Sequence, residues 1–298
     1  MRAAVLVLAV CLTCIVPSSS EAWGLEAHRF IMDRAIDRLP PELLPFFDRV
    51  RPYMVERSID PDLWRIAGWE EEPPRHFVDL DAYGAYPFND LPREYDRAVE
   101  KFGVATIRQN GVLPWRVAEM YGNLRRAFQD AARGESDYAV SNARFYAAIL
   151  AHYVSDAHVP FHAVLNHDGQ LTGQRGIHAR FETELFERYR NELKIAPPEK
   201  RSAVSDARAF AFDALLASYR LAQPVLDADR RAAAGREAYD GGYFERFFAD
   251  VRGTLEQRLS DSIAGVAAVI TGAWDAAGRP RLPLDTRRRA RPVPKSNR

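Results

Sequence analysis

The sequence of 298 residues predicts an all-α protein, folded as a compact bundle of several helices. Apolar side chains recur at helical spacing, for example from Val117 through Leu124 to Phe128 and again from Leu255 to Trp274. Proline or glycine marks several of the segment ends, as expected at helix boundaries. No segment shows the alternation of apolar and polar residues that is typical of a half-buried strand. Helices alone are therefore expected.

The predicted elements follow one another along the chain. Helices are expected at 23–39, 42–51, 114–133, 137–159 and 203–222, around the HxxxE motif at 178–182, and in a long C-terminal segment that includes 255–274. The short second helix should end near Pro52. Between Val55 and Asp90, dense proline, glycine and aromatic residues predict an ordered loop. Loops of this length in small domains usually serve a function.

Residues 1–22 have the pattern of a secretory signal peptide. Arg2 precedes an apolar run from Ala3 to Val16, and small and polar residues follow before Trp23. The run is short for a membrane span, although an uncleaved N-terminal anchor is the alternative. We expect a secreted or periplasmic protein that begins at Trp23. Because both cysteines lie within the signal, disulfides would not stabilise the mature chain.

The remainder fits one domain, 23–278, followed by a basic tail, 279–298. Arginine and proline dominate the tail, which has almost no apolar periodicity, so it is predicted to be disordered. The whole chain contains 41 Lys and Arg against 41 Asp and Glu, so its net charge indicates no particular partner. Nothing in the sequence implies a protein partner.

Two pairs of polar residues at helical spacing predict a metal site. His152 and Asp156 are four residues apart, as are His178 and Glu182, so each pair shares one helix face. Pro160 should end the first of these helices and turn the following residue, His162, back toward the ligands. Imidazole and carboxylate together are a ligand set for zinc.

The neighbouring residues indicate that these pairs are buried. Phe145 and Ile149 continue the face of His152 and Asp156, so that face should point inward. Phe181 and Leu185 flank the second pair in the same way. Buried histidines and carboxylates are unfavourable unless they are paired or bind a metal. Metal binding is therefore favoured, and a metal-free hydrogen-bond network is the alternative.

Further residues complete an ordered set of motifs. Trp23 at the predicted cleavage site is followed by His28, Asp62, His76, the HxxxD motif with His162 after it, and the HxxxE motif. This order resembles the superfamily of zinc-dependent phospholipases C and single-strand-specific nucleases. The resemblance covers nearly the whole mature chain. It implies an all-α bundle that encloses a trinuclear zinc cluster.

The resemblance also implies which residues hold each of three zinc ions. One ion would be held by Asp62, His76, His152 and Asp156, a second by His162, His178 and Glu182, and a third by Trp23, His28 and the other oxygen of Asp156. Trp23 would bind through its free α-amino nitrogen and carbonyl oxygen, so signal cleavage would complete the site. Asp60 is an alternative to Asp62, which we prefer because Arg65 follows it as in the related nucleases.

Such a cluster predicts hydrolysis of a phosphodiester by metal-activated hydroxide, without a covalent enzyme intermediate. Asp62 is the catalytic candidate that would orient or deprotonate the water. Arg65 would contact phosphate or pair with Glu70–Glu72, and Trp64, Phe77 and His167 are candidate substrate-binding residues. His158 is expected to play a structural role or to support the ligands.

The substrate is predicted less directly. The HxxxE motif favours the phospholipase C branch, with phospholipid as substrate and peripheral contact with a membrane. The Trp-x4-His spacing of Trp23 and His28 favours the nuclease and 3'-nucleotidase branch instead, and Leu63 replaces the aromatic residue associated with choline binding. An acidic loop argues against nucleic acid; its acidic residues are Glu70–Glu72, Asp79, Asp81 and Asp90. A non-catalytic zinc-binding protein is a further alternative.

Overall fold

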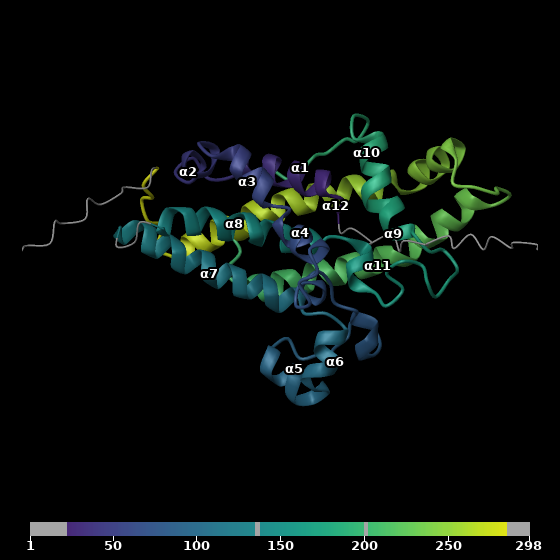
Figure 1. Cartoon of the computed structure of the whole chain (residues 1–298), viewed down its shortest axis with the longest axis horizontal. Coiled ribbons are helices and arrows are strands. Elements are labelled where there is room, and N and C mark those ends of the chain that lie inside the picture. Colours follow the sequence, from purple (N-terminus) through teal and green to yellow (C-terminus); the bar gives the residue numbers. More distant parts are fainter. Residues whose placement is uncertain (1–22, 135–137, 200–201, 285–298) are drawn as a thin grey trace, which may run out of the picture.

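The computed structural model describes residues 23–134, 138–199 and 202–284, and within these residues every regular element is a helix (Figure 1). The all-α prediction is confirmed for this part of the chain. The predicted signal peptide, 1–22, and residues 285–298 of the predicted tail lie outside the described residues. The tail begins in contact with the bundle, because the Trp274 indole donates to the Pro280 carbonyl and Arg144 donates to the Leu284 carbonyl.

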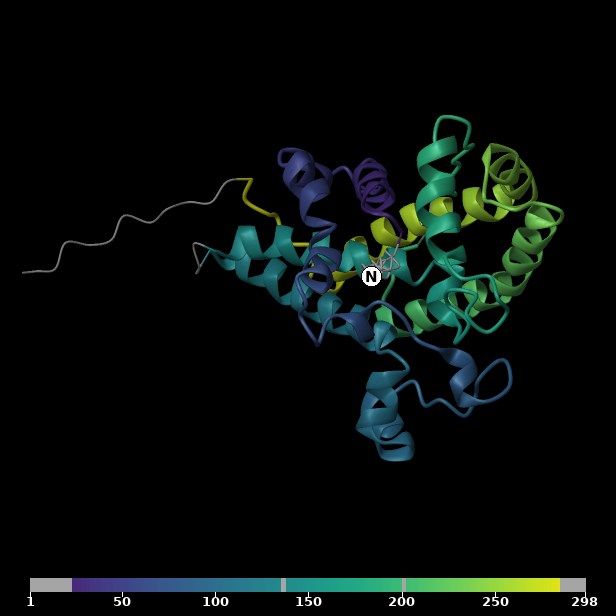
Figure 2. The same ribbon diagram turned by 45° about the vertical axis from the view of Figure 1, so that its right-hand side comes forward.

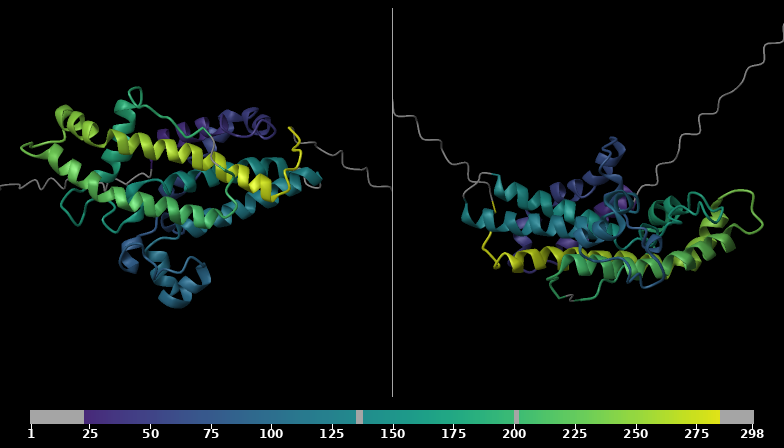
Figure 3. Two further views of the ribbon diagram at one scale, coloured as in Figure 1. Left: turned by 180° about the vertical axis from the view of Figure 1, so that it is seen from behind. Right: turned by 90° about the horizontal axis from the view of Figure 1, so that it is seen from below.

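Four long helices form the body of the protein. They are α7 (Leu113–Arg133), α8 (Ala139–Asp156), α11 (Ala207–Ala233) and α12 (Gly241–Ala276). Each packs against at least two of the others, and α11 and α12 run side by side across the back of the molecule (Figure 3). The helix α7 begins with a proline in its first turn and ends at Gly134, whose left-handed conformation closes the helix.

The helix α8 lies at the centre of the bundle. It contacts α7 and α12 as well as three helices of the N-terminal part, α1 (Leu25–Ile36), α3 (Arg51–Arg57) and α4 (Asp60–Ile66). Every residue from Ala147 to Asp156 is buried. A helix that is buried on all sides does not show a simple apolar stripe. His152 and Asp156 are consequently placed inside the bundle rather than on its surface.

The N-terminal region differs from the prediction in its details. The predicted helix 42–51 is found only as the shorter α2 (Leu44–Asp48), and Pro52, near which a helix end was expected, lies in the first turn of α3. The predicted loop from Val55 to Asp90 contains α4 and two 3₁₀ turns, η1 (Pro73–Arg75) and η2 (Leu80–Tyr83). Proline is tolerated in the first turn of a helix, where its missing N–H group would have no partner.

The remaining elements are short. The helices α5 (Tyr95–Phe102) and α6 (Val104–Gln109) project to one side of the bundle (Figure 2). The turn η3 (Pro160–Ala163) follows α8, and α9 (Ile177–Ala179), the π-helical segment η4 (Arg180–Glu184) and α10 (Leu185–Tyr189) form one continuous rod. Among the described residues no helix is both long enough and apolar enough to cross a bilayer.

Candidate metal centre

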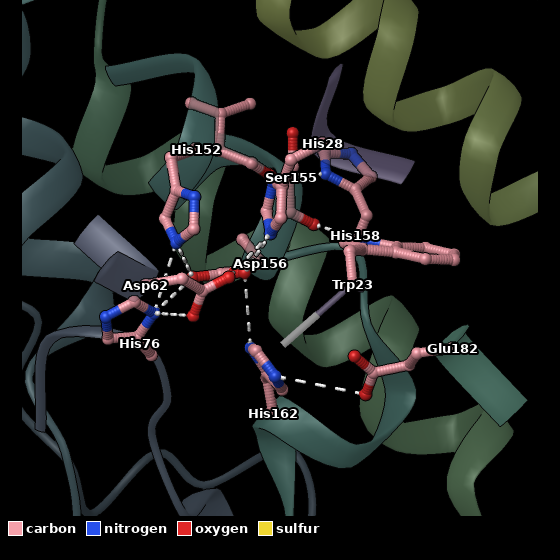
Figure 4. Close-up of polar contacts among 12 residues, drawn as sticks. Trp23, His28, Asp62, His76, His152, Ser155, Asp156, His158, His162 and Glu182 are labelled. Atoms are coloured by element: carbon pink, nitrogen blue, oxygen red, sulfur yellow. Dashed lines mark hydrogen bonds and ion pairs between the residues drawn. The ribbon is translucent and has the colours of Figure 1, made fainter. Parts of the chain in front are cut away.

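The predicted ligands come from widely separated parts of the chain and meet at one end of α8 (Figure 4). The turn before α1 provides Trp23, α1 provides His28, α4 provides Asp62, the residue after η1 is His76, α8 provides His152 and Asp156, η3 provides His162, α9 provides His178, and η4 provides Glu182. All nine are buried. The helix α8 ends at Asp156, a few residues earlier than predicted, and His162 after Pro160 turns back toward Asp156 as predicted.

Asp156 lies between two sets of histidines. Its Oδ2 atom is 3.1 Å from His76 Nδ1 and 3.3 Å from His152 Nε2. Its Oδ1 atom is 3.4 Å from His28 Nε2 and 3.7 Å from His162 Nδ1. The two carboxylate oxygens therefore face different groups, which is the arrangement that a carboxylate shared by two ions requires.

The first group surrounds Oδ2 of Asp156. His152 Nε2 lies 3.2 Å from His76 Nδ1, and Asp62 Oδ1 lies 3.9 Å from the same nitrogen. The ring of His28 stacks on that of His152 at a centroid distance of 3.9 Å. Asp60 does not join this group, because its carboxylate pairs with Arg57 at 3.3 Å. Of the two aspartates left open by the sequence, the structure thus brings Asp62 to the histidines.

The second group contains the HxxxE motif. His162 Nε2 lies 3.1 Å from His178 Nε2 and 3.9 Å from Glu182 Oε1, and His178 Nε2 contacts the same glutamate oxygen. The segment from Arg180 to Glu184 is π-helical rather than α-helical. Such a widened turn inside a helix often marks a functional site. His178 and Glu182 still share one face and point at His162.

Trp23 lies beside both groups. Its indole Nε1 donates to the Ser155 carbonyl at 2.9 Å, and its side chain is fully buried. The main-chain N–H group of Trp23 faces the carboxylate of Glu182 and stabilises its charge. The backbone nitrogen of residue 23 therefore lies on the side of the centre formed by Glu182, whereas the prediction places it with His28 and Asp156.

Three sets among the described residues have ligand atoms close enough to hold a metal ion: Asp62, His76 and His152; His28, His152 and Asp156; and His162, His178 and Glu182. The set of His162, His178 and Glu182 is the predicted one, and the set of Asp62, His76 and His152 contains three of the four residues predicted for its ion. The set around His28 includes the His152 side chain, whereas the prediction named the backbone of Trp23 beside His28 and Asp156. Atoms that share a tetrahedral zinc ion at 2.0–2.2 Å are about 3.3 Å apart, and most of the separations above are close to that value.

Unsatisfied polar atoms also fit a metal. Buried atoms without a hydrogen-bond partner include both ring nitrogens of His28, Asp62 Oδ2, Asp156 Oδ1, and Nδ1 of His162 and His178. A buried polar group without a partner costs about 1–3 kcal/mol, and so many in one place would be strongly destabilising. Coordination would satisfy one ring nitrogen of each histidine and the carboxylate oxygens that face an ion, so these buried groups could bind metal ions.

The close packing of these buried groups shifts their pKa values. Burial opposes the charge of Asp156, but His152 and His162 outweigh it and hold the pKa of this carboxyl well below its usual range. Burial, with Asp156 and Asp62 nearby, raises the pKa of Glu182. Burial lowers the pKa of His162 to about 4. A neutral imidazole is the form that binds metal.

A cavity of about 170 Å³ opens beside the centre. It is lined by Arg65, Pro73, His76, Phe77, Phe161, His162, His167 and His178. Three of the predicted substrate-binding residues, Arg65, Phe77 and His167, therefore lie at the cavity. Trp64 does not line it; its ring stacks on that of Trp69 at 5.4 Å and packs against Phe145.

Arg65 has a different partner from the one considered in the sequence. Its Nη2 atom lies 3.2 Å from Asp62 Oδ1, so it pairs with the candidate catalytic aspartate rather than with Glu70–Glu72. His158 stands outside the metal groups. Its Nδ1 atom hydrogen-bonds the Val154 carbonyl at 2.8 Å and its ring lies near Phe210, which fits a structural role.

Sequence reasoning missed the residues behind the ligands. Ser58 offers its carbonyl to His152 Nδ1 at 2.9 Å, and Glu72 lies 3.5 Å from His76 Nε2. The sequence places Glu72 in the acidic loop, yet its side chain is fully buried. The spacing of four between Glu72 and His76 was a signal that could have been noticed, whereas no pattern marks a backbone carbonyl.

Comparison with known proteins adds no family assignment. No protein-family model matches the chain, and a search among curated proteins gave no significant match.

Proposed function

We propose that this protein is a zinc-dependent hydrolase of phosphodiesters, phospholipase C-like, that acts outside the cytoplasm. The observation that supports it is the convergence of three metal-ligand sets on Asp156 beside an open cavity. Three zinc ions are proposed, held by the nine residues described above. Bound zinc would neutralise the charge of a phosphodiester and lower the pKa of a water molecule.

The residues of the chain have distinct roles in this proposal. Asp62 has one carboxylate oxygen, Oδ1, engaged by Arg65 and the other, Oδ2, buried without a hydrogen bond. The free oxygen is placed to orient a water molecule or to accept its proton. Arg65 lines the cavity, so its guanidinium can contact a phosphate while it holds Asp62 in place.

The cavity walls favour a substrate with an apolar part. Pro73, Phe77 and Phe161 contribute rings beside the histidines. Such a surface suits the glycerol and acyl region of a phospholipid, and contact with a membrane surface would accompany this substrate. Phospholipid is accordingly the first substrate proposed, in line with the HxxxE motif.

A single-strand nuclease or 3'-nucleotidase is the second candidate, and one structural feature supports it. The loop is less acidic toward solvent than its sequence indicates. Glu72 and Asp79 are buried, Glu71 pairs with Arg75 at 3.4 Å, and Asp90 pairs with Lys101 at 3.0 Å. The charge argument against nucleic acid is therefore weaker than it was from the sequence alone, and aromatic side chains such as Phe77 can stack on a base.

The deciding experiment uses one zinc-loaded preparation of the mature chain. Phospholipid micelles, single-stranded DNA and RNA are assayed side by side, with Asp62→Asn as the inactive variant and Asp60→Asn as its matched control. We expect phospholipid cleavage that a chelator abolishes and that Asp62→Asn reduces by at least about 100-fold. Degradation of nucleic acid alone would establish the second candidate. Zinc binding without hydrolysis of any of these substrates would favour a non-catalytic zinc protein.

A further inference from the structure

A buried glutamate lies directly behind one of the candidate ligands. Glu72 is fully buried, and its Oε1 atom is 3.5 Å from His76 Nε2. The same oxygen accepts a hydrogen bond from the Tyr153 hydroxyl, while Oε2 accepts from Arg75 Nη1 at 2.8 Å. Both oxygens are therefore occupied, and one of them faces the ring nitrogen of His76 that points away from the metal groups.

The two ring nitrogens of His76 have opposite surroundings. Nδ1 faces Asp156 Oδ2 at 3.1 Å and His152 Nε2 at 3.2 Å, which makes it the nitrogen available to a metal. A neutral imidazole carries one proton, and the nitrogen that binds the metal must not carry it. A carboxylate that accepts a hydrogen bond from Nε2–H keeps the proton there and leaves the lone pair on Nδ1.

The local fold holds the glutamate rigidly. Glu72 immediately precedes η1, whose two prolines, Pro73 and Pro74, restrict the backbone between it and His76. Tyr153 follows the ligand His152 on α8, and the guanidinium of Arg116 lies 5.1 Å from the centre of the Tyr153 ring. Residues from η1, α7 and α8 thus fix one carboxylate behind one histidine.

The neighbouring Glu71 is an example of a glutamate that only forms a surface ion pair. Glu71 also pairs with Arg75, at 3.4 Å, but 70% of its side chain is exposed. A glutamate that served only to neutralise Arg75 would have no reason to be buried, because burying an ion pair usually brings no net stability. In addition to Arg75, the buried Glu72 contacts the Tyr153 hydroxyl and the ring of His76.

His152, the candidate ligand beside His76, is also oriented by a hydrogen-bond acceptor behind its ring. His152 Nδ1 lies 2.9 Å from the Ser58 carbonyl, so its Nε2 faces the metal groups. Nε2 of His76 is buried without a hydrogen bond, as are Nδ1 of His28 and Nδ1 of His178, but a carboxylate oxygen of Glu72 lies 3.5 Å from it. The ring nitrogens of His76 and His152 that point away from the metal groups thus each face an oxygen atom.

We propose that Glu72 is a positioning residue that holds His76 with its proton on Nε2 and its Nδ1 directed at the ion shared with Asp62 and His152. This inference rests on the metal centre of the proposed function, although not on the identity of the substrate. Tyr153 and Arg75 support Glu72 in this role by satisfying its remaining hydrogen-bonding capacity.

The test compares Glu72→Gln with Glu71→Gln in the mature chain. The amide is nearly the same size as the carboxylate but accepts the imidazole proton more weakly. Zinc stoichiometry and affinity are measured by competition with a chelator. We expect Glu72→Gln to weaken one of the bound ions about 10–100-fold and leave the others unchanged, while Glu71→Gln matches the unchanged protein.

A second measurement separates positioning from simple stabilisation. Nitrogen-15 NMR of the zinc-loaded protein reports which nitrogen of His76 carries the proton. We expect Nε2–H in the unchanged protein and a loss or shift of that signal in Glu72→Gln. Unchanged zinc affinities together with an unchanged His76 signal would overturn the inference, even if the variant melted at a lower temperature, because a purely structural glutamate predicts that result.

If Glu72→Gln does not fold, as judged by circular dichroism, Tyr153→Phe decides instead. It removes one hydrogen bond to Glu72 Oε1 and should weaken the same single ion by a few-fold; equal affinity for every ion would count against the inference.

An unchanged protein that bound no zinc would refute both the metal centre and the role of Glu72. Zinc binding without hydrolysis would count against the proposed function alone.

Discussion

At the scale of single residues, Asp156 is the side chain on which two ligand groups depend. Its Oδ2 faces His76 and His152, and its Oδ1 faces His28 and His162. We predict that Asp156→Asn removes two of the three proposed zinc ions, because an amide is a poorer ligand on both sides. Elemental analysis should then find at most one ion per chain. Asp60→Asn, which alters a buried carboxylate paired with Arg57, should keep all three.

Asp79 gives a second prediction, on pH dependence. Burial, reinforced by Asp81, raises the pKa of the Asp79 carboxyl from 3.8 to about 8. Between these pH values the folded protein keeps a proton that the unfolded chain has lost, so the free energy of unfolding falls as the pH rises from about 4 to about 8. Asp79→Asn should abolish this contribution and stabilise the protein at pH 8 by about 1 kcal/mol or more.

The measurement for Asp79 is denaturant unfolding across that pH range. Asp96→Asn, on the exposed face of α5, serves as the control and should leave the slope unchanged. A slope that persists in Asp79→Asn would show that another group is responsible for it. Asp79 Oδ1 is buried without a hydrogen bond, which is consistent with a protonated side chain at neutral pH.

At the scale of elements, the π-helical segment η4 depends on a buried ion pair. Arg180 Nη2 lies 3.0 Å from Asp229 Oδ1 on α11, and the Tyr243 hydroxyl of α12 contacts the same carboxylate. Breaking a buried pair costs about 3–5 kcal/mol. We therefore predict that Asp229→Asn lowers the free energy of unfolding by about 3 kcal/mol and weakens the ion held by His178 and Glu182.

The matched control for Asp229→Asn is Asp227→Asn, which lies two residues away on the same helix. Asp227 forms an exposed pair with Arg230 at 3.4 Å, so its loss should change stability by less than about 0.5 kcal/mol. Unfolding curves and zinc titrations of both variants check the prediction. Equal effects of the two substitutions would argue that the pair does not support η4.

Helices are predicted correctly from the sequence where a single apolar stripe along the segment determines how it packs. The helix from Pro114 to Gly134 matches α7, because a proline start and a glycine end bracket a clear amphipathic pattern. The prediction for 203–222 stops too early: α11 continues to Ala233 with Pro224 inside it, since packing against α7 and α12 outweighs the local cost of the proline. Short helices such as α4 carry too few residues for a periodicity to be seen.

The candidate site was predictable for a different reason. Ligand spacings of four residues, as in His152 with Asp156, are visible in any sequence and fix the geometry once a helix forms. The preference for Asp62 over Asp60 rested on Arg65 and the resemblance, not on spacing, because both aspartates occupy the first turn of α4 and only the packing of that helix brings Asp62 to the histidines. The partners behind the ligands, such as the Ser58 carbonyl, depend on contacts between distant segments.

At the scale of the whole molecule, bound metal should stabilise the fold. The ligands join α1, α4, η1, α8, η3 and the α9–η4 rod, so coordination would tie together segments from Trp23 to Glu182. Binding to the folded state alone adds about 4 kcal/mol when free zinc exceeds the dissociation constant 1,000-fold. We predict that chelation lowers the melting temperature by about 10 °C or more. Calorimetry with and without chelator measures this, and equal curves would favour a metal-free hydrogen-bond network.

At the same scale, the proposed processing of the N-terminus would link export to metal binding. The backbone nitrogen of Trp23 faces Glu182, and the Trp23 side chain is locked in the core by its bond to the Ser155 carbonyl. Cleavage before Trp23 would convert an amide nitrogen, which cannot bind zinc, into an amine that can bind it once deprotonated. The precursor should therefore lack one ion.

Two versions of the protein test this prediction, one that begins at Trp23 and one with a single additional residue in front of it. The extended version should bind one zinc ion fewer and hydrolyse its substrate at least about 10-fold more slowly, since its amine is displaced from the centre. Both should melt cooperatively, because the buried indole is the same in each. Full zinc content and activity with the additional residue in place would show that the amine of Trp23 is not a ligand, and the side chains of His28, His152 and Asp156 would then hold the ion near His28.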